Sequence, residues 1–294
     1  MGRAIHGFTM VVLGLGAHAG DLSAQDSAAM ARFHAIPWED GPTNGALSEA
    51  QVRVPEGCRF AEAAGTREFL EFTENPVSGN ERGVMLCRGE GEQRSWFVIF
   101  TFDDIGLVKD EEKDELDADK ILGSLREGND AGNQERLERG WETISLDGWV
   151  REPYYDPRTN NLTWATMIST ASGDRSVNHS VRLLGRGGVM NADLVIDPEA
   201  LESAMPAFDS VIGGFGYLPG NRYAEWRDGD KVAAIGLTAL VAGGVGAAAA
   251  KAGLLGKLGK LLAAGGKAIV AGLIAAVAGL RALFKRKQGG ASAA

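Results

Sequence analysis

The sequence has few of the residues on which enzymes and metal sites most often depend. Its 294 residues include two cysteines and four histidines. A nucleophile elbow, a P-loop, an HExxH zinc motif and paired CxxC motifs are all absent. Two histidines fall within the first 18 residues, and His34 lies in a segment rich in Ala, Ser, Asp and Gln. A catalytic triad or a multi-histidine site would therefore depend on His179.

His179 is interpreted as a core residue. It alternates with Val177, Val181 and Leu183, and this alternation places all four side chains on the apolar face of a strand. A packed histidine is favoured over a catalytic base.

Acidic residues are missing from one region of the chain. Residues 231–294 contain nine Lys and Arg and no Asp or Glu, which leaves 21 basic against 39 acidic residues and a net charge of −18 elsewhere. This asymmetry predicts an acidic part in water and a basic, apolar part near anionic lipid. Nucleic acid is not expected as a partner, because phosphate binding requires clustered positive charge.

The N-terminus has the layout of a secretory signal peptide. Arg3 precedes the apolar stretch 8–17, and small residues at 17–19 follow. We expect a signal peptide over 1–19, cleaved after Ala19 or Ala24, with an uncleaved anchor as the alternative. A flexible lead is expected over 20–45.

The C-terminal region is predicted to be a membrane anchor over 231–287. Residues 232–250 are 19 consecutive uncharged residues, long enough for one transmembrane helix. Residues 251–267 form an amphipathic basic segment, and 268–284 are a second apolar helix. One span or a hairpin of two remains open, and 288–294 are expected to be disordered. Small residues along 236–250 favour helix association, within the chain or with a second copy.

Residues 46–228 are predicted to form an α+β domain, an antiparallel sheet with helices packed on it. Residues 95–102 are apolar on both faces, as in a central strand. A helix is expected from the N-cap Asp117 towards Arg139. Strands are expected near 143–152, 161–170, 176–184 and 189–196, with a hairpin turn at 185–188. Because these signals end by Tyr217, a chain shortened to end near Arg227 is expected to fold.

The two cysteines, Cys58 and Cys87, both lie in the part predicted to be exported. A disulfide is allowed there, and it would close a loop of roughly 30 residues, worth roughly 3 to 4 kcal/mol. Two buried thiols are the alternative.

The acidic stretch 103–119 departs from the EF-hand pattern. A solvated loop followed by a helix N-terminus explains it better, and no metal or cofactor is predicted. A carboxylate-dependent hydrolase using Asp103, Asp104 and Asp156 is the alternative function, since two carboxylates with separated pKa values suffice for acid–base chemistry.

A candidate binding patch surrounds the turn after Asp156. Clustered Tyr, Asp, Asn and Trp side chains beside arginines of a nearby hairpin are typical of a recognition surface. The same residues also read as turn chemistry before a strand. The candidate residues are Tyr155, Asp156, Asn160, Asn161, Trp164, Asn178, Arg182 and Arg186.

Several segments, taken in order, resemble a family of uncharacterised membrane-anchored bacterial proteins classed as a domain of unknown function. The resemblance covers about residues 40–285, with departures at His179 and Gly187. A more distant likeness, to the PsbP and Mog1 type of α+β fold, rests on Val54–Gly57 and on the closing helix before Phe215. The resembling segments are Trp96–Lys109, Asp117–Asp119, Gly148–Trp149, Tyr155–Ala165, Val177–Asn178, Leu184–Arg186, Gly188–Met190, Leu194–Pro198, Arg222–Tyr223 and Asp230–Ala233.

The family resemblance implies a signal peptide, an exported domain and a C-terminal anchor, and it implies no established activity. The favoured hypothesis is a non-enzymatic binding or scaffolding module of the bacterial cell envelope. It would sit in the inner membrane with its folded domain in the periplasm. Its partners would be the lipid bilayer and a protein or a second copy of the chain.

Overall fold

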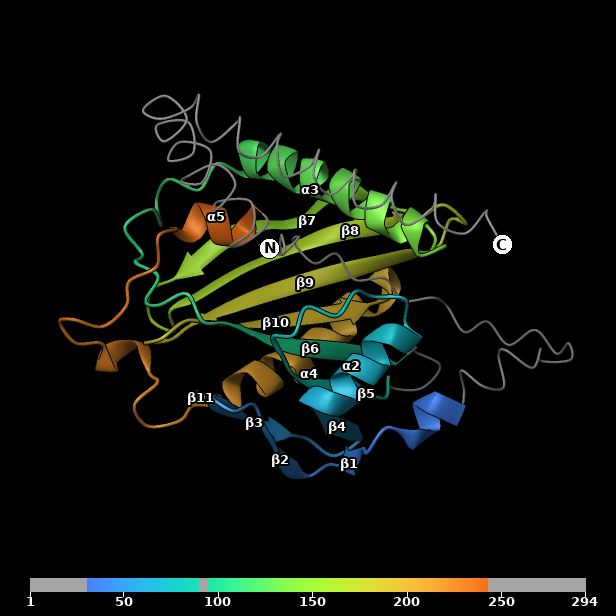
Figure 1. Ribbon diagram of the computed structural model, residues 1–294, viewed down its shortest axis with the longest axis horizontal. Coiled ribbons are helices and arrows are strands. Elements are labelled where there is room, and N and C mark those ends of the chain that lie inside the picture. Colours follow the sequence, from blue (N-terminus) through green and yellow to red (C-terminus); the bar gives the residue numbers. More distant parts are fainter. Residues whose placement is uncertain (1–30, 90–94, 243–294) are drawn as a thin grey trace, which may run out of the picture. The chain divides into compact units, whose positions relative to one another are not determined.

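The computed structural model describes residues 31–89 and 95–242. Its centre is an eight-stranded antiparallel sheet in the order β1-β4-β5-β6-β10-β9-β8-β7 (Figure 1). The predicted α+β class with a large antiparallel sheet is confirmed. The strands are β1 (Glu39–Asp40), β4 (Cys58–Glu62), β5 (Glu81–Cys87), β6 (Trp96–Asp103), β7 (Ile144–Asp156), β8 (Asn161–Thr170), β9 (Arg175–Leu184) and β10 (Val189–Ile196).

The central position of β6 follows from its sequence. Trp96, Val98 and Phe100 point into one apolar cluster, while Phe97 and Ile99 point into another on the opposite face. A strand covered on both faces reads as a continuous apolar run. The β9–β10 hairpin predicted at 185–188 is also confirmed, with Gly185 N–H donating to the carbonyl of Gly188.

One face of the sheet, called here the core face, packs on a second sheet and a helix. The second sheet has the order β11-β3-β2, with β2 (Thr43–Ala46), β3 (Ala50–Val54) and β11 (Phe215–Tyr217). The helix is α4 (Leu201–Gly213), preceded by η1 (Pro198–Ala200). α4 passes through Pro206 without ending there. Together these elements enclose the largest apolar cluster.

The other face, called here the helix face, carries α2 (Ala63–Phe72) and α3 (Ala118–Glu138). α3 begins as predicted, with the carboxylate of Asp117 accepting from Lys120 N–H at 3.1 Å. α2 begins at Ala63, and the hydroxyl of Thr66 in its first turn donates to the carbonyls of Ala61 and Glu62. α2 packs against β4 and β5, and α3 packs against β7.

The segment after β11 crosses back over one end of the sheet, and we call residues 218–242 the C-terminal arm. It contains η2 (Tyr223–Glu225) and α5 (Leu237–Val241). Leu237, Leu240 and Val241 are buried in a cluster with residues of α3 and β8. The predicted boundaries at 228 and 231 are therefore wrong, because the folded domain continues into 232–242.

The predicted transmembrane span 232–250 is corrected over its first part. Residues 232–236 are extended or bent, and the following helix has five residues. None of the helices in the described part of the chain is long and apolar enough to cross a bilayer. The rest of this span and the segments 251–267, 268–284 and 288–294 lie outside the described residues, as does the predicted signal peptide.

The predicted flexible lead is also corrected. Residues 31–35 are helical, and β1 and β2 follow. Ile36 is buried against α2, beside Phe33 and Trp38. The apolar residues of this segment, spaced between polar ones, gain by packing on α2 even though the composition resembles a linker. Residues 20–30 are outside the described part.

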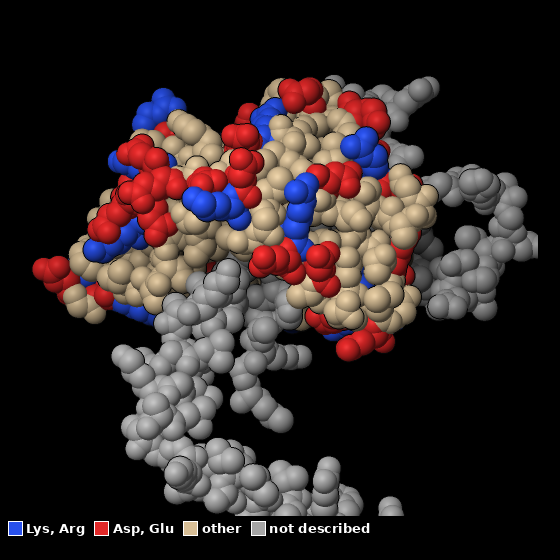
Figure 2. All heavy atoms as spheres, turned by 90° about the horizontal axis from the view of Figure 1, so that it is seen from above, with Lys and Arg blue, Asp and Glu red and all other residues tan. Residues whose placement is uncertain are grey.

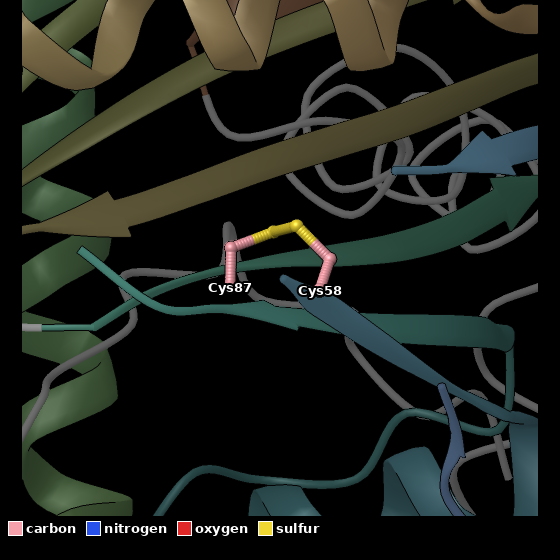
Figure 3. The surroundings of a disulfide bond; sticks show 2 residues. All are labelled: Cys58 and Cys87. Atoms are coloured by element: carbon pink, nitrogen blue, oxygen red, sulfur yellow. A yellow bond between two sulfur atoms is a disulfide. The ribbon is translucent and has the colours of Figure 1, made fainter. Parts of the chain in front are cut away.

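Cys58 and Cys87 form a disulfide between the paired strands β4 and β5 (Figure 3). They lie directly opposite each other in the strand register, and both side chains are buried. The structure thus decides between the two alternatives left by the sequence in favour of the bonded pair.

Candidate functional site

A band of polar side chains crosses the helix face of the sheet, and we call it the polar strip. Strand register places Ser180 opposite Asp193, and Asn191 between Arg182 and Thr101. Polar side chains inside a covered face are costly unless they are hydrogen-bonded or used. The strip consists of Thr101, Asp103, Thr166, Asn178, Ser180, Arg182, Asn191 and Asp193.

The strip lies where the two helices of this face do not pack. α2 is seated on β4 and β5, and α3 on β7 at the other edge. In Figure 1, β9 and β10 run between α3 and α2. Apolar residues under the helices flank the strip on both sides, with Val195 and Ile99 towards α2 and Leu162 towards α3.

Asp193 organises the middle of the strip. Its Oδ1 accepts hydrogen bonds from Ser180 Oγ at 2.6 Å and from Arg182 Nη1 at 2.8 Å. The guanidinium of Arg182 lies 4.6 Å from the ring centroid of Trp164. The side chains of Arg182 and Asp193 are 13% and 15% exposed, so the strip reaches solvent at this pair. The ion pair neutralises the charges of Arg182 and Asp193.

Asn191 is held in one orientation by its neighbours. Its Nδ2 donates to Thr101 Oγ1 at 3.0 Å and to Asp103 Oδ2 at 2.9 Å. Flipping the amide would place two oxygens in contact at Asp103, so the orientation follows from chemistry. As a result Oδ1 of Asn191 points away, and it is buried with no hydrogen-bond partner among the described residues.

Asn178 carries a second unpaired acceptor on the same face. It is 7% exposed, and its Oδ1 is buried with no hydrogen-bond partner in residues 31–89 and 95–242. A buried polar atom without a partner costs about 1 to 3 kcal/mol, and such atoms call for an explanation. The strip thus presents two acceptors that lack donors from the described part of the protein.

Comparison with known proteins places the chain in a family. A family model described as "Protein of unknown function (DUF2167)" matches residues 39–278. The chain belongs to the DUF2167 family. A comparison with curated proteins found no match.

Solved structures similar to this DUF2167 protein share low sequence identity with it. The PsbP protein CyanoP from Synechocystis sp. PCC 6803 is 12% identical with a TM-score of 0.35, covering 62% of this chain and 91% of its own. The Ran-binding protein Mog1p from Saccharomyces cerevisiae is 11% identical with a TM-score of 0.31, covering 64% and 100%. Protein PA94 of unknown function from Pseudomonas aeruginosa, a putative regulator, is 14% identical with a TM-score of 0.30, covering 60% and 97%.

Of the residues that the sequence singled out in this DUF2167 chain, three come together in or against the strip. Trp164, Asn178 and Arg182 project from β8 and β9 onto the helix face. Sequence reasoning missed Ser180, Asp193 and Asn191. The alternation of polar residues in Ser176–Arg182 was a usable signal, but the pairing with β10 was needed to bring Asp193 alongside.

The other candidate residues serve the fold at one end of the sheet. Tyr155 is buried, and its hydroxyl donates to Asn160 Oδ1 at 3.2 Å. Asp156 accepts from Arg158 within the turn. Asn161, which pairs with Leu183, lies on the core-face side of β8. These residues are better explained as turn chemistry.

Arg186 is separated from the strip by its role in the C-terminal arm. Its Nε and Nη2 donate to the two carboxylate oxygens of Asp230 at 2.7 and 2.8 Å. This bidentate pair holds the pKa of Asp230 below its usual value. The inclusion of Arg186 in a binding patch is therefore corrected: its guanidinium is occupied by the arm.

The three carboxylates of the hydrolase alternative do not converge. Asp103 accepts from Asn80 and Asn191, whereas the exposed Asp104 faces Lys231. Asp156 ends β7, four strand spacings from β6 in the sheet order, or about 19 Å. A shared acid–base site requires contact through one substrate. The described residues also contain no group of three His, Cys, Asp or Glu arranged to hold a metal ion.

Charge on the visible surface is mixed. Figure 2 shows acidic side chains spread over this face, with Lys and Arg interspersed among them. A separate cavity of about 490 Å³ is lined by Arg32, by Glu71 of α2, and by Arg139 and Trp141 just after α3. Its arginines are already paired with glutamates. The polar strip is therefore the stronger candidate site.

His179 lies on the core face, as predicted. Its ring packs edge-on against the ring of Phe208, with the two ring centroids 5.3 Å apart. Burial, together with the positive charge of Arg151, lowers its pKa from 6.5 to about 4. At pH values between about 4 and 6.5, His179 is protonated in the unfolded chain and neutral in the folded chain. Stability is therefore lost as pH falls from about 6.5 towards 4, by about 3 kcal/mol at pH 4.

We expect His179→Phe to remove this part of the acid sensitivity. The measurement is the free energy of unfolding in urea at pH 7 and near pH 4. The difference in this free energy between the two pH values should shrink by about 3 kcal/mol in the variant. Equal differences in both proteins would show that His179 is protonated in the fold or accessible to solvent.

Proposed function

We propose that this DUF2167 protein is a non-catalytic binding module of the bacterial cell envelope, with the polar strip as its binding surface. The observation that carries this proposal is the pair of buried amide oxygens without donors on Asn178 and Asn191. A bound partner that donates hydrogen bonds would satisfy both. The ion pair Arg182–Asp193, where the strip reaches solvent, would fix the orientation of the partner.

The proposal also places the domain outside the cytoplasm and holds it at the inner membrane through residues beyond 242. Its support is the signal-like start, the acid-free basic region from residue 231, and the disulfide. Disulfides persist mainly in oxidising compartments.

Crosslinking tests the binding surface. We expect the full chain, crosslinked in cells and purified in detergent, to retain specific partners that Arg182→Met loses. Removal of one member of a hydrogen-bonded charge pair at an interface typically costs 2 to 5 kcal/mol. Arg175→Met on the same strand is the matched control, because Arg175 is exposed and meets Asp147 at 3.9 Å only. Identical partners from both variants would contradict the proposal.

Chemical labelling tests the compartment. Thr159 lies exposed in the β7–β8 turn and is suited to a Thr159→Cys substitution. Because both native cysteines are bonded, the new thiol should react with a membrane-impermeant maleimide in cells whose inner membrane is intact. Protection until lysis would refute export. The unsubstituted protein controls for background reaction.

A further inference from the structure

We infer that the ligand of the polar strip is an extended peptide segment of a partner protein, held through its backbone N–H groups. This inference rests on the proposed binding function and specifies its chemistry. The starting point is the orientation of Asn191, whose amide nitrogen is committed to Thr101 and Asp103. Its free oxygen can only accept, so a ligand at this position must donate.

The charge of the strip disfavours an anion. Arg182 is neutralised by Asp193, and Asp103 lies next to Asn191 with its carboxylate. Phosphate or carboxylate ligands would meet this negative charge without a free cation to compensate it. A neutral or basic donor is favoured, and the net charge of −18 outside residues 231–294 favours it as well.

The spacing of the two acceptors matches an extended backbone. Asn178 is paired with Val195 and Asn191 with Arg182, so the two asparagines are four residues apart along the strands and one strand apart across them. This corresponds to about 14 Å. N–H groups at positions i and i+4 of an extended segment point the same way and are separated by about 13 to 14 Å. The spacing therefore matches one extended peptide, and because both oxygens are buried, the groups that cover them must move aside for it to bind.

Aromatic surface distinguishes a peptide from a sugar, the main competing neutral ligand. A sugar would gain from a free aromatic face, but Arg182 already covers Trp164, with its guanidinium 4.6 Å from the ring centroid. Hydrogen bonds to the backbone of an extended segment are a common peptide-recognition arrangement.

The test is selection from a phage-displayed library of random peptides against the full chain in detergent, followed by fluorescence anisotropy with the selected peptides. We expect Asn178→Leu to weaken binding on the order of tenfold or more, since it removes one buried acceptor. The same substitution should leave folding intact or raise stability, because an unpaired buried oxygen is replaced by an apolar group of similar shape.

Asn129→Leu is the matched control for binding. Asn129 is also buried with an unpaired Oδ1, but it lies on α3 and donates to the carbonyl of Ile144, away from the strip. Its variant should bind the selected peptides as the unsubstituted protein does.

A parallel arm with soluble peptidoglycan glycan strands separates this inference from the function on which it rests. Glycan binding that Asn178→Leu abolishes, without any strip-dependent peptide, would overturn the peptide and leave the binding module standing. A library that yields no peptide sensitive to Asn178→Leu, together with no glycan binding, would overturn both. Loss of peptide binding by Asn178→Leu and not by Asn129→Leu would support both.

Discussion

A chain shortened to end at Arg227 will fail to fold stably, contrary to what the sequence alone suggests. The truncation removes Leu237, Leu240 and Val241, which are at most 3% exposed. Each fully buried side chain of this kind contributes about 1.5 to 3 kcal/mol. The sum over the three side chains, roughly 4.5 to 9 kcal/mol, is comparable with the total stability of a typical domain. Urea unfolding and a one-dimensional proton spectrum would measure the loss.

A chain ending at Ala247 is the control, because it keeps the arm and the whole first compact unit. We expect it to unfold at the same urea concentration as the full chain. Leu240→Ala in the longer chain isolates the packing contribution and should cost about 2 to 5 kcal/mol. If the chain ending at Arg227 unfolded at the same urea concentration as the one ending at Ala247, α5 would not belong to the core.

Loss of the disulfide should have the second-largest effect. The bond closes a loop with a sequence separation of 29 residues, for which the chain-entropy model gives roughly 3 to 4 kcal/mol. Cys58→Ala combined with Cys87→Ala should lower the free energy of unfolding by about that amount, because the unfolded chain gains freedom. Chemical unfolding under non-reducing conditions is the measurement.

The single variant Cys58→Ala and the reduced native protein provide the controls. Since both sulfurs are buried, reduction is expected to require denaturant before the reductant can act. Native protein unfolded and refolded under reducing conditions should match the double variant. An unchanged urea midpoint for the double variant would mean that native strain offsets the entropic gain.

Patterns within single elements predicted much of the fold. β6 was recognisable because both of its faces are apolar, and α3 because Asp117 caps it ahead of Ile121 and Leu125. α3 contains Gly128 and Gly132 and still continues to Glu138. Tertiary contacts outweigh the modest cost of a glycine in a helix. Here Asn129 and Asn133 of α3 donate to the carbonyl of Ile144 in β7.

The C-terminal arm could not be predicted because its partners are remote in sequence. Val232 forms an isolated β-bridge with Leu107, and the carboxylate of Glu112 accepts a hydrogen bond from Thr238 N–H at the start of α5. A run of Ala, Gly, Val and Leu has the same composition whether it enters lipid or caps a sheet end. The acidic stretch 103–119 was similarly read as solvated loop, whereas Glu112 helps to hold the arm.

The sequence predicted only part of the candidate site, because the rest depends on contacts between residues that are remote in sequence. Trp164, Asn178 and Arg182 stood out by residue type, but Asp193 and Asn191 appear ordinary within the apolar strand β10. Their significance depends on which strands are neighbours. Sheet order places β6 beside the consecutive strands β10, β9 and β8 from a second region of the chain, and no local pattern encodes the pairing of β6 with β10.

The pairing of β3 with β11 and the closure of the sheet end by α5 also constrain when the protein can fold. Residues 50–54 have no partner on one side until residues 215–217 have appeared, and the cluster around Leu162 is incomplete until residue 241 has appeared. A chain delivered from its N-terminus must therefore arrive nearly whole before the domain closes. Such long-range closure is slow, so the emerging chain would stay unfolded until most of it has been delivered.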